Sequence, residues 1–236
     1  MKISIAIPTW GCHGRGSEFI NDLLRTIEIQ TFKDFEVCIS DHCLDDGILN
    51  ETKKFQDKFK IVYQLNPNDR GSGPANTNEA IKLCSGDIIK VMFQDDFFYD
   101  DEALQKIHDK FELEDSKWLV NGCNHTQDDG HTFFWEMFPR WNDKILEGKN
   151  TISSPSVLSM KRECFDKVKF DKNLIMMMDC DYYYNLRENF GDPIFLDDVL
   201  ITNRIHQNQI SSRYDSNNLE LECDYCIAKH TNVIRS

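Results

Sequence analysis

The alternation of short apolar runs with amphipathic stretches in the first hundred residues is the feature that most constrains the fold. Apolar runs of strand length lie at residues 3–8, 35–40, 60–65 and 87–94. Helical stretches separate them, one beginning at Ser17 and another set by Pro74 and ended by Gly86. Strands that alternate with helices pair in parallel through right-handed crossovers. The sequence therefore predicts an α/β fold with a mainly parallel, Rossmann-like central sheet flanked by helices.

The pattern changes after about residue 100. A helix with Leu104, Ile107 and Phe111 is followed by WLVNGC, TFFWEMF and SVLSM, which are typical of antiparallel strands. A helix around MMMDCDYYYNLREN, a strand pair in DPIFLDDVLITNRIH and a C-terminal helix from about Asn217 complete the chain. We expect a smaller, mixed or antiparallel second half, and because no repeat or linker interrupts residues 1–236, a single domain.

Composition excludes several classes of partner. A net charge of −13 opposes binding to nucleic acid and to anionic lipid surfaces, although a small anion could still bind through a local cation. Apolar runs are too short for a membrane span, and the first residues read as a strand rather than an export signal. Nine unpatterned cysteines then favour reduced thiols. We expect a soluble, cytoplasmic protein.

Polar residues gather where the predicted parallel strands end. Asp41, Arg70 and the pair Asp95–Asp96 lie just beyond such ends, where α/β sheets bind their ligands. Two adjacent carboxylates repel, and a divalent cation such as Mg²⁺ or Mn²⁺, which prefers oxygen ligands, would compensate them. The alternative is an exposed acidic turn that caps the next helix.

Four segments together resemble the nucleotide-binding half of the family 2 glycosyltransferases, which have a GT-A fold. They are ISIAIPTW, EVCISD, RGSGPANTNEAIKLCSG and GDIIKVMFQDD, in the order and spacing of that family. The resemblance covers roughly residues 1–215. It implies a nucleotide-binding half at 1–100 and an acceptor-binding and catalytic half at 101–215. Residues 216–236, which the resemblance does not cover, are expected to form a C-terminal helix.

The resemblance implies roles for the residues of the first half. Pro8 and Thr9 would border the nucleotide base, and Asp41 would accept a hydrogen bond from a uracil imide. Arg70 would contact the base or its edge. A turn cap for Asp41 and a solvated surface position for Arg70 are the alternatives.

The acidic motif departs from the family's commonest form, Asp-x-Asp, because Gln94 occupies its first acidic position. The resemblance implies that Asp95 holds the ribose hydroxyls and that Asp96 binds the metal, Mn²⁺ or Mg²⁺. In the segment NRIHQNQIS it implies that His206 reaches back to this metal. Arg204, Gln209, Ser211 and Arg213 are weaker candidates for contacts with a diphosphate.

The segment MMMDCDYYYNL resembles the family's catalytic segment and implies that Asp179 is the general base, with Asp181 as its competitor. Met178 stands where the family usually has Glu. A carboxylate within hydrogen-bond reach of a sugar hydroxyl can take its proton as the new bond forms. Helix capping is the alternative for these aspartates.

The implied reaction is inverting, metal-dependent transfer of a sugar from a nucleoside diphosphate donor, a UDP-sugar first, to a hydroxyl of a glycan or other acceptor. By analogy, Ser154 and Ser156 would bond acceptor hydroxyls. For the aromatic segment TFFWEMFPRW, core packing, a subunit contact in a homo-oligomer and sugar stacking are alternatives. A nucleotidyltransferase and a catalytically silent binding module of the same fold are the rival functions.

Overall fold

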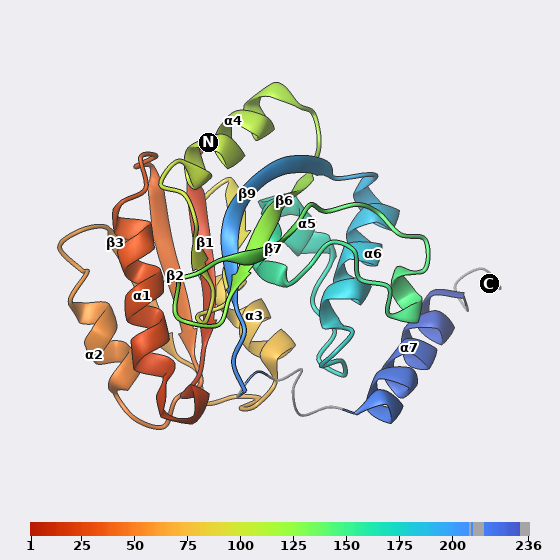
Figure 1. The fold of residues 1–236 in the computed structure, drawn as a ribbon, viewed down its shortest axis with the longest axis horizontal. Coiled ribbons are helices and arrows are strands. Elements are labelled where there is room, and N and C mark those ends of the chain that lie inside the picture. The colour runs from red at the N-terminus through yellow and green to blue at the C-terminus, as the bar shows by residue number, and fades with distance from the viewer. Residues whose placement is uncertain (208, 210–214, 232–236) are drawn as a thin grey trace.

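The computed structural model describes residues 1–207, 209 and 215–231, and in its first half parallel strands alternate with helices (Figure 1). The strands β1 (Ile3–Thr9), β2 (Phe35–Asp41), β3 (Lys60–Leu65) and β4 (Ile88–Val91) pair in parallel in the order β3-β2-β1-β4. Helices α1 (Gly16–Glu28), α2 (Gly47–Lys53) and α3 (Gly73–Lys82) connect them. Because helices cover both faces, β1 and β2 are buried almost throughout. The predicted α/β architecture is confirmed.

The sheet continues into the second half through antiparallel contacts. Strand β8 (Leu158–Lys161) lies antiparallel between β4 and β6 (Trp118–Thr126), and the order goes on through β9 (Ile194–Arg204) to the short β5 (Phe97–Phe98). Strand β7 (Phe134–Met137) pairs antiparallel with β6 outside this order. The mixed second half is therefore also confirmed, and its strands extend the sheet of the first half.

Two strand predictions differ from the structure. The expected strand pair near residue 200 is the single strand β9, because Asp197 and Asp198 bulge out of the ladder between the pairs Asn121–Leu196 and Gly122–Val199. The expected strand at 87–94 ends at Val91. It is followed by a turn in which the Asp96 N–H donates to the Phe93 carbonyl, 3.1 Å away. This turn carries Asp95 to the end of the sheet.

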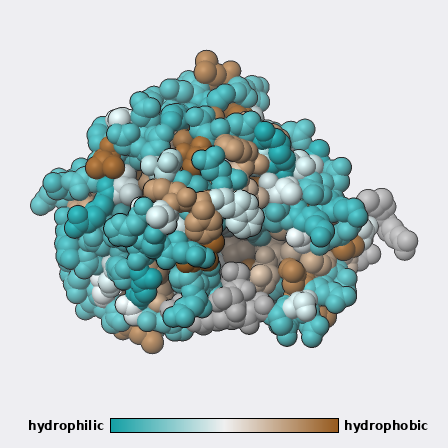
Figure 2. All heavy atoms as spheres, in the orientation of Figure 1, coloured by the Kyte–Doolittle hydropathy of each residue, from teal (hydrophilic) through white to brown (hydrophobic). Residues whose placement is uncertain are grey.

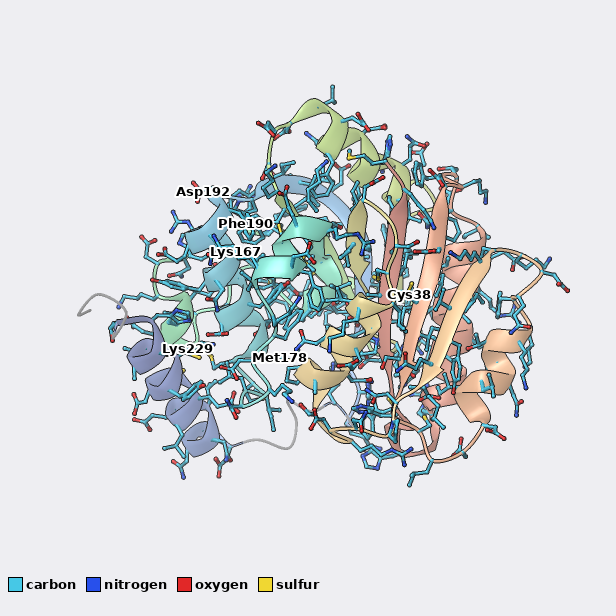
Figure 3. All side chains as sticks on the ribbon, turned by 180° about the vertical axis from the view of Figure 1, so that it is seen from behind. Cys38, Lys167, Met178, Phe190, Asp192 and Lys229 are labelled. Carbon is cyan, nitrogen blue, oxygen red and sulfur yellow. The ribbon has the colours of Figure 1, made fainter. Side chains whose placement is uncertain are left out.

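Helices α4 (Ala103–Leu113), α5 (Arg162–Lys167) and α6 (Met178–Phe190) cover the second half, with 3₁₀ turns at Cys12–Gly14, Ile145–Glu147 and Pro155–Val157. The last helix, α7 (Ser216–Thr231), lies at the outer edge, where Figure 3 labels its Lys229. The predicted C-terminal helix is thus present. Among the helices that the structure describes, none has the length and apolar character to span a membrane.

Candidate active site

A cavity of about 830 Å³ opens at the carboxyl ends of β1, β2 and β4. Its first-half wall comes from the loops after β1, β2 and β4 and from the start of α3, and its second-half wall from Ser154, Pro155 and the start of α6. Parallel strands bring these loops to one edge of the sheet, the usual place for a ligand in such a fold. We call this cavity the main cleft.

Asp95 and His206 meet in the main cleft, although 111 residues separate them. The His206 Nε2 lies 3.1 Å from the Asp95 Oδ2, and the His206 ring packs on Phe19 with 5.0 Å between centroids. Two ligand atoms bound at right angles to Mg²⁺ or Mn²⁺, at about 2.1 Å each, lie roughly 3 Å apart. The pair therefore fits a divalent cation that would replace the proton now shared between them.

The cation would need further ligands. Among the residues that the structure describes, no three His, Cys, Asp or Glu side chains converge to hold a metal. Mg²⁺-type sites commonly combine one or two protein ligands with substrate phosphates and water. The geometry therefore suits a metal that binds together with a phosphorylated substrate.

Asp96 lies behind this pair. Its Oδ1 accepts from the Arg204 N–H at 3.1 Å, its Oδ2 faces the Ser154 hydroxyl at 3.5 Å, and its side chain is buried. Burial, aided by the charge of Asp95, raises the pKa of Asp96 to about 8. The resemblance implied that Asp96 and His206 bind the metal together. In the structure the carboxylate in contact with His206 is that of Asp95.

Arg204 is enclosed rather than aimed at the cleft. Its guanidinium, only 2% exposed, pairs with Asp22 at 3.1 Å and with Asp129, and it also donates to the Asp95 carbonyl at 3.0 Å. It lies over the ring of Phe19, 4.6 Å from the centroid. The predicted diphosphate contact for Arg204 is therefore wrong, because these partners occupy its guanidinium. Gln209 lines the cleft, and Ser211 and Arg213 lie outside the described residues.

Asp41 is fully buried at the end of β2. Its Oδ1 accepts from the Thr9 hydroxyl at 3.0 Å and from the Cys43 N–H at 2.8 Å, and its Oδ2 accepts from the Tyr63 hydroxyl at 2.7 Å. Neither Asp41 nor Thr9 borders the cleft, whereas Pro8 does. The structure thus places Asp41 and Thr9 one layer behind the expected base-binding surface, where they hold the ends of β1 and β2 together.

Arg70 lies on the surface before α3 and does not border the cleft, although the following Gly71 does. The side chain that faces the cleft in this region is His42. Its Nε2 lies 3.0 Å from the Asn66 Nδ2, and burial, with the nearby charge of Arg70, lowers the pKa of His42. A neutral imidazole at this position suits a flat, uncharged group such as a nucleobase.

Gln94 fixes the loop after β1. Its Oε1 accepts from the Trp10 N–H at 2.6 Å and its Nε2 donates to the Trp10 carbonyl at 2.8 Å, with a further contact to the Cys12 Sγ at 2.9 Å. Only an amide side chain both donates and accepts in this way. The departure from Asp-x-Asp thus has a structural reason, since a carboxylate could not donate to the Trp10 carbonyl.

If the main cleft binds the nucleotide that the sequence predicts, replacing Gln94 with Glu is expected to loosen this loop and to weaken nucleotide binding about tenfold. The added carboxylate cannot donate to the Trp10 carbonyl, and it adds a negative charge beside Asp95. Titration calorimetry with UDP and Mn²⁺ measures the change. Gln94→Asn, which keeps the amide but shortens the side chain, is the control. Equal affinity of wild type and Gln94→Glu would contradict this role.

Asp179 stands on the opposite wall of the cleft, in the first turn of α6. Its Oδ2 accepts from the Asn150 Nδ2 at 2.7 Å and its Oδ1 from the Cys180 N–H at 2.7 Å. Burial raises the pKa of Asp179 to about 6, against the lowering effect of these donors. A carboxylate with such a pKa suits a general base that works near neutral pH.

Asp181 points away from the cleft. It is fully buried, and it pairs with Lys229 at 2.9 Å and with the His230 Nε2 at 2.7 Å, both on α7. The prediction of Asp181 as a competing base is therefore wrong. One helical turn cannot bring both aspartates to one face at a spacing of two residues, so Asp179 faces the cleft and Asp181 anchors α7.

Asp181→Asn is expected to destabilise the protein by about 2–3 kcal/mol, because it removes the buried carboxylate that His230 contacts and one of the two carboxylates that pair with Lys229, which stays paired with Asp171. Urea unfolding monitored by circular dichroism would show a lower midpoint at an unchanged slope. Donor hydrolysis by the folded variant should stay near the wild-type rate. An unchanged midpoint would show that the ion pairs do not hold α7.

Two further residues support the Asp179 wall and were not predicted. Asn150 bonds Asp179 and also the Ser153 carbonyl at 3.1 Å. Glu222 on α7 accepts from the N–H groups of three consecutive residues before α6, at 2.8–3.1 Å; these are Ile175, Met176 and Met177. Sequence alone carried no signal for them, because Asn150 acts on a side chain 29 residues away and Glu222 on backbone groups about 46 residues away.

Ser154 and Ser156, the two serines expected to contact the acceptor, have different surroundings. Ser154 borders the cleft, and its hydroxyl donates to the Asn203 Oδ1 at 3.0 Å. Ser156 is fully buried, and its Oγ accepts from the Phe93 N–H at 3.0 Å. Ser154 therefore stays a candidate for substrate contact, whereas the expectation for Ser156 is wrong because its hydroxyl supports the turn before Asp95.

The main cleft brings the Asp95–His206 pair and the half-buried Asp179 to one cavity, and comparison with known proteins identifies the family. The family model described as glycosyl transferase family 2 matches residues 4–168. The chain therefore belongs to glycosyl transferase family 2.

Curated relatives agree with this assignment. The poly(ribitol-phosphate) beta-N-acetylglucosaminyltransferase TarS of Staphylococcus aureus is 31% identical over 100 residues, 41% of this chain and 17% of TarS. Chondroitin synthase of Escherichia coli is 30% identical over 126 residues, 53% of this chain and 18% of the synthase. The alignments thus span less than a fifth of each of these longer relatives.

Solved structures share the fold. A crystal structure of S. aureus TarS with UDP-GlcNAc superposes with a TM-score of 0.78 at 20% identity, covering 97% of this chain and 66% of that one. The mannosyltransferase PcManGT from Pyrobaculum calidifontis, in complex with GDP-Man and Mn²⁺, gives a TM-score of 0.66 at 12% identity, covering 98% and 75%. The predicted GT-A fold is confirmed.

Proposed function

We propose that this glycosyltransferase moves a sugar from a nucleoside diphosphate donor, a UDP-sugar first, to a hydroxyl acceptor with inversion at the anomeric carbon. One observation carries the proposal. Asp95 from the first half of the chain, and His206 and the half-buried Asp179 from the second, line one cavity of about 830 Å³. Such an arrangement leaves room for a donor between a diphosphate-binding end and a base.

Asp95 and His206 would hold a divalent cation, Mn²⁺ or Mg²⁺, together with the diphosphate. A bound cation supplies neutralisation of the charge that develops on the leaving diphosphate. Asp96 remains a proposed second carboxylate whose ionisation such a cation would favour. The Mn²⁺ bound to PcManGT supports the choice of metal.

Asp179 would take the proton of the acceptor hydroxyl. Asn150 and the Cys180 N–H fix the orientation of its carboxylate, while Glu222 orders the backbone before α6. Because the base faces the cleft wall opposite Asp95, the acceptor would attack from the side away from the diphosphate, which inverts the anomeric centre. No covalent intermediate is required.

At the nucleotide end, Pro8, His42 and the backbone from Gly71 to Gly73 would border the base. Asp41 and Thr9 would act by positioning the backbone at Cys43, and Arg70 by its charge beside His42. UDP is favoured as the nucleotide because the TarS complexes hold UDP or UDP-GlcNAc. Relatives that act on poly(ribitol-phosphate), and chondroitin synthase, support a glycan or polyol polymer as the acceptor class.

Two rival functions are weaker. A nucleotidyltransferase would need a cationic phosphate loop after β1, but Arg15 pairs with Glu18 and Asp129 instead. A silent binding module would have no use for a carboxylate with a raised pKa, such as Asp179, at the cleft wall. Release of diphosphate from a donor distinguishes an enzyme from such a module.

A donor screen tests the proposal. The protein is incubated with Mn²⁺ and separately with UDP-glucose, UDP-galactose, UDP-GlcNAc and GDP-mannose, and the released nucleoside diphosphate is measured. We expect hydrolysis of at least one UDP-sugar, faster than that of GDP-mannose, and none after chelation by EDTA. Preferential release of UMP together with a sugar 1-phosphate would instead indicate cleavage within the diphosphate, as expected of a nucleotidyltransferase-type site.

A further inference from the structure

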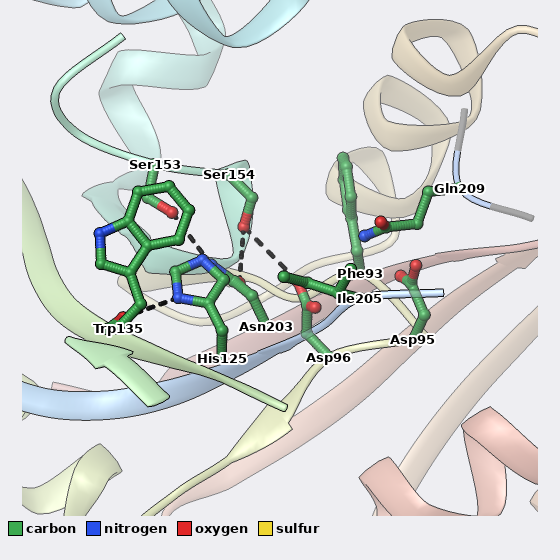
Figure 4. A pocket seen from close by; sticks show the side chains of 10 residues that line it. All are labelled: Phe93, Asp95, Asp96, His125, Trp135, Ser153, Ser154, Asn203, Ile205 and Gln209. Atoms are coloured by element: carbon green, nitrogen blue, oxygen red, sulfur yellow. Dashed lines mark hydrogen bonds between the residues drawn. The ribbon is translucent and has the colours of Figure 1, made fainter. Parts of the chain in front are cut away.

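A second, smaller pocket of about 270 Å³ adjoins the main cleft. Figure 4 shows its lining, with Trp135 and His125 at one end and Asp95 and Gln209 at the other. The two cavities share Phe93, Asp95, Ser154 and Gln209 as lining residues. The new walls come from β6 and β7 and from the end of β9, so the pocket belongs to the second half of the protein. A ligand in it would lie directly beside the proposed diphosphate end of the donor.

The aromatic wall of this pocket is Trp135. Its side chain is 68% exposed, which excludes core packing, and its backbone adopts a left-handed φ of 48° that is uncommon for a bulky residue. The ring stacks on His125, with 5.0 Å between centroids, and the His125 Nδ1–H donates to the Trp135 carbonyl at 2.8 Å. The indole is thus held in place while much of it stays open.

The opposite wall is polar and already organised. The Asn203 amide donates to the Ser153 hydroxyl at 3.0 Å and accepts from the Ser154 hydroxyl at 3.0 Å, and the Asp96 carboxyl lies next to Ser154. Hydroxyl, amide and carboxyl groups beside an open aromatic face match the chemistry of a sugar ring, which has apolar C–H faces and hydroxyl edges. The pocket volume suits a single ring.

The pocket is also linked to the base. Asn150 bonds both the Ser153 carbonyl and the Asp179 carboxylate, so one side chain connects the pocket wall to the group that would deprotonate an acceptor. We propose that the pocket between Trp135 and Asn203 binds the terminal sugar ring of the acceptor, with one face of that ring on the indole. The proposal rests on the proposed function and adds an acceptor class, a saccharide with an accessible hydroxyl.

The neighbouring exposed aromatic side chains suggest an alternative to sugar binding, a contact between two copies of the chain. Phe133, Phe134 and Phe138 are 39–43% exposed, and Figure 2 shows apolar side chains gathered over β7 at the middle of this face. A contact between copies of the chain would use the whole group. Sugar stacking would use Trp135, since Trp135 is the member of this group that lines the pocket.

The test separates acceptor binding from donor binding. With the UDP-sugar that the wild type hydrolyses, transfer to methyl glycosides of glucose, galactose and N-acetylglucosamine is measured for wild type, Trp135→Ala, Trp135→Phe and Phe138→Ala. We expect Trp135→Ala to raise the acceptor KM roughly two- to tenfold, the range of one aromatic contact. Trp135→Phe should recover most of the affinity, and Phe138→Ala should match the wild type.

Donor hydrolysis without acceptor is the internal control. It should be the same in all four proteins, which also shows that the variants are folded. An equal rise of donor KM in Trp135→Ala would place the donor sugar on the indole and overturn the proposal. So would an unchanged acceptor KM together with a loss of self-association in both Trp135→Ala and Phe138→Ala, measured by sedimentation. Absence of any donor hydrolysis in the wild type would refute the proposed function itself.

Discussion

Replacing Asp179 with asparagine is expected to lower kcat for sugar transfer by roughly 10²- to 10⁴-fold, the usual contribution of a positioned general base. Asparagine keeps the shape and the hydrogen bond to Asn150 but cannot accept a proton from the acceptor. KM for the donor should change little, because Asp179 acts on the acceptor. Transfer of radiolabelled sugar, followed at saturating donor, measures the loss.

The pH dependence of the wild type gives a second readout of the same residue. The pKa of Asp179 lies at about 6, raised by burial. Only the ionised form can act as a base, so kcat should fall about tenfold per pH unit below pH 6 and level off above it. Asp181→Asn, which changes the same helical turn without changing the base, should keep this profile. Full activity of Asp179→Asn would contradict the assignment.

Replacing Asp95 with asparagine is expected to reduce kcat/KM by about 100-fold and to abolish the Mn²⁺ dependence of nucleotide binding. The variant removes the negative charge that meets His206 at 3.1 Å, and with it the proposed hold on the cation. Nucleotide affinity is measured by calorimetry at several Mn²⁺ concentrations.

Asp96→Asn is the matched comparison, since it removes the neighbouring carboxylate that sequence pattern alone would choose. A smaller loss is expected, because Asp96 lies behind the cleft against Arg204 and Ser154. If Asp96→Asn lost the Mn²⁺ dependence and Asp95→Asn kept it, the sequence-based assignment would be right and the structural one would fail.

The fold was predictable because its strands are continuous apolar runs. The runs that became β1 and β2 were identified with nearly their final bounds, since burial on both faces leaves no polar alternation to confuse the pattern. The edge strand β3 is half-buried to exposed, and its bounds were identified from KIVYQL. The bulge in β9 was not predictable, because two adjacent aspartates are typical of a turn between strands. Only the pairing of Val199 with Gly122 on β6 shows that the strand continues past Asp197 and Asp198.

The site was predictable as a set of regions but not in its atomic pairings. Asp95, Asp179 and His206 do reach one cleft. Sequence could not tell which of Asp95 and Asp96 contacts His206, because the turn after Val91 sets the direction of each side chain. Nor could it tell which of Asp179 and Asp181 faces the cleft, because Asp181 is held by Lys229 on α7, nearly 50 residues away. Asn150 acts on the distant Asp179 side chain and Gln94 on the distant Trp10 backbone, and such contacts leave no trace in local sequence.

The most direct test of the account is titration calorimetry of UDP into the protein with Mn²⁺ and with EDTA. We expect one UDP bound per chain in Mn²⁺, with affinity at least tenfold weaker in EDTA and no such difference in Asp95→Asn. Absence of UDP binding under both conditions, or equal binding in Mn²⁺ and EDTA by the wild type, would contradict it.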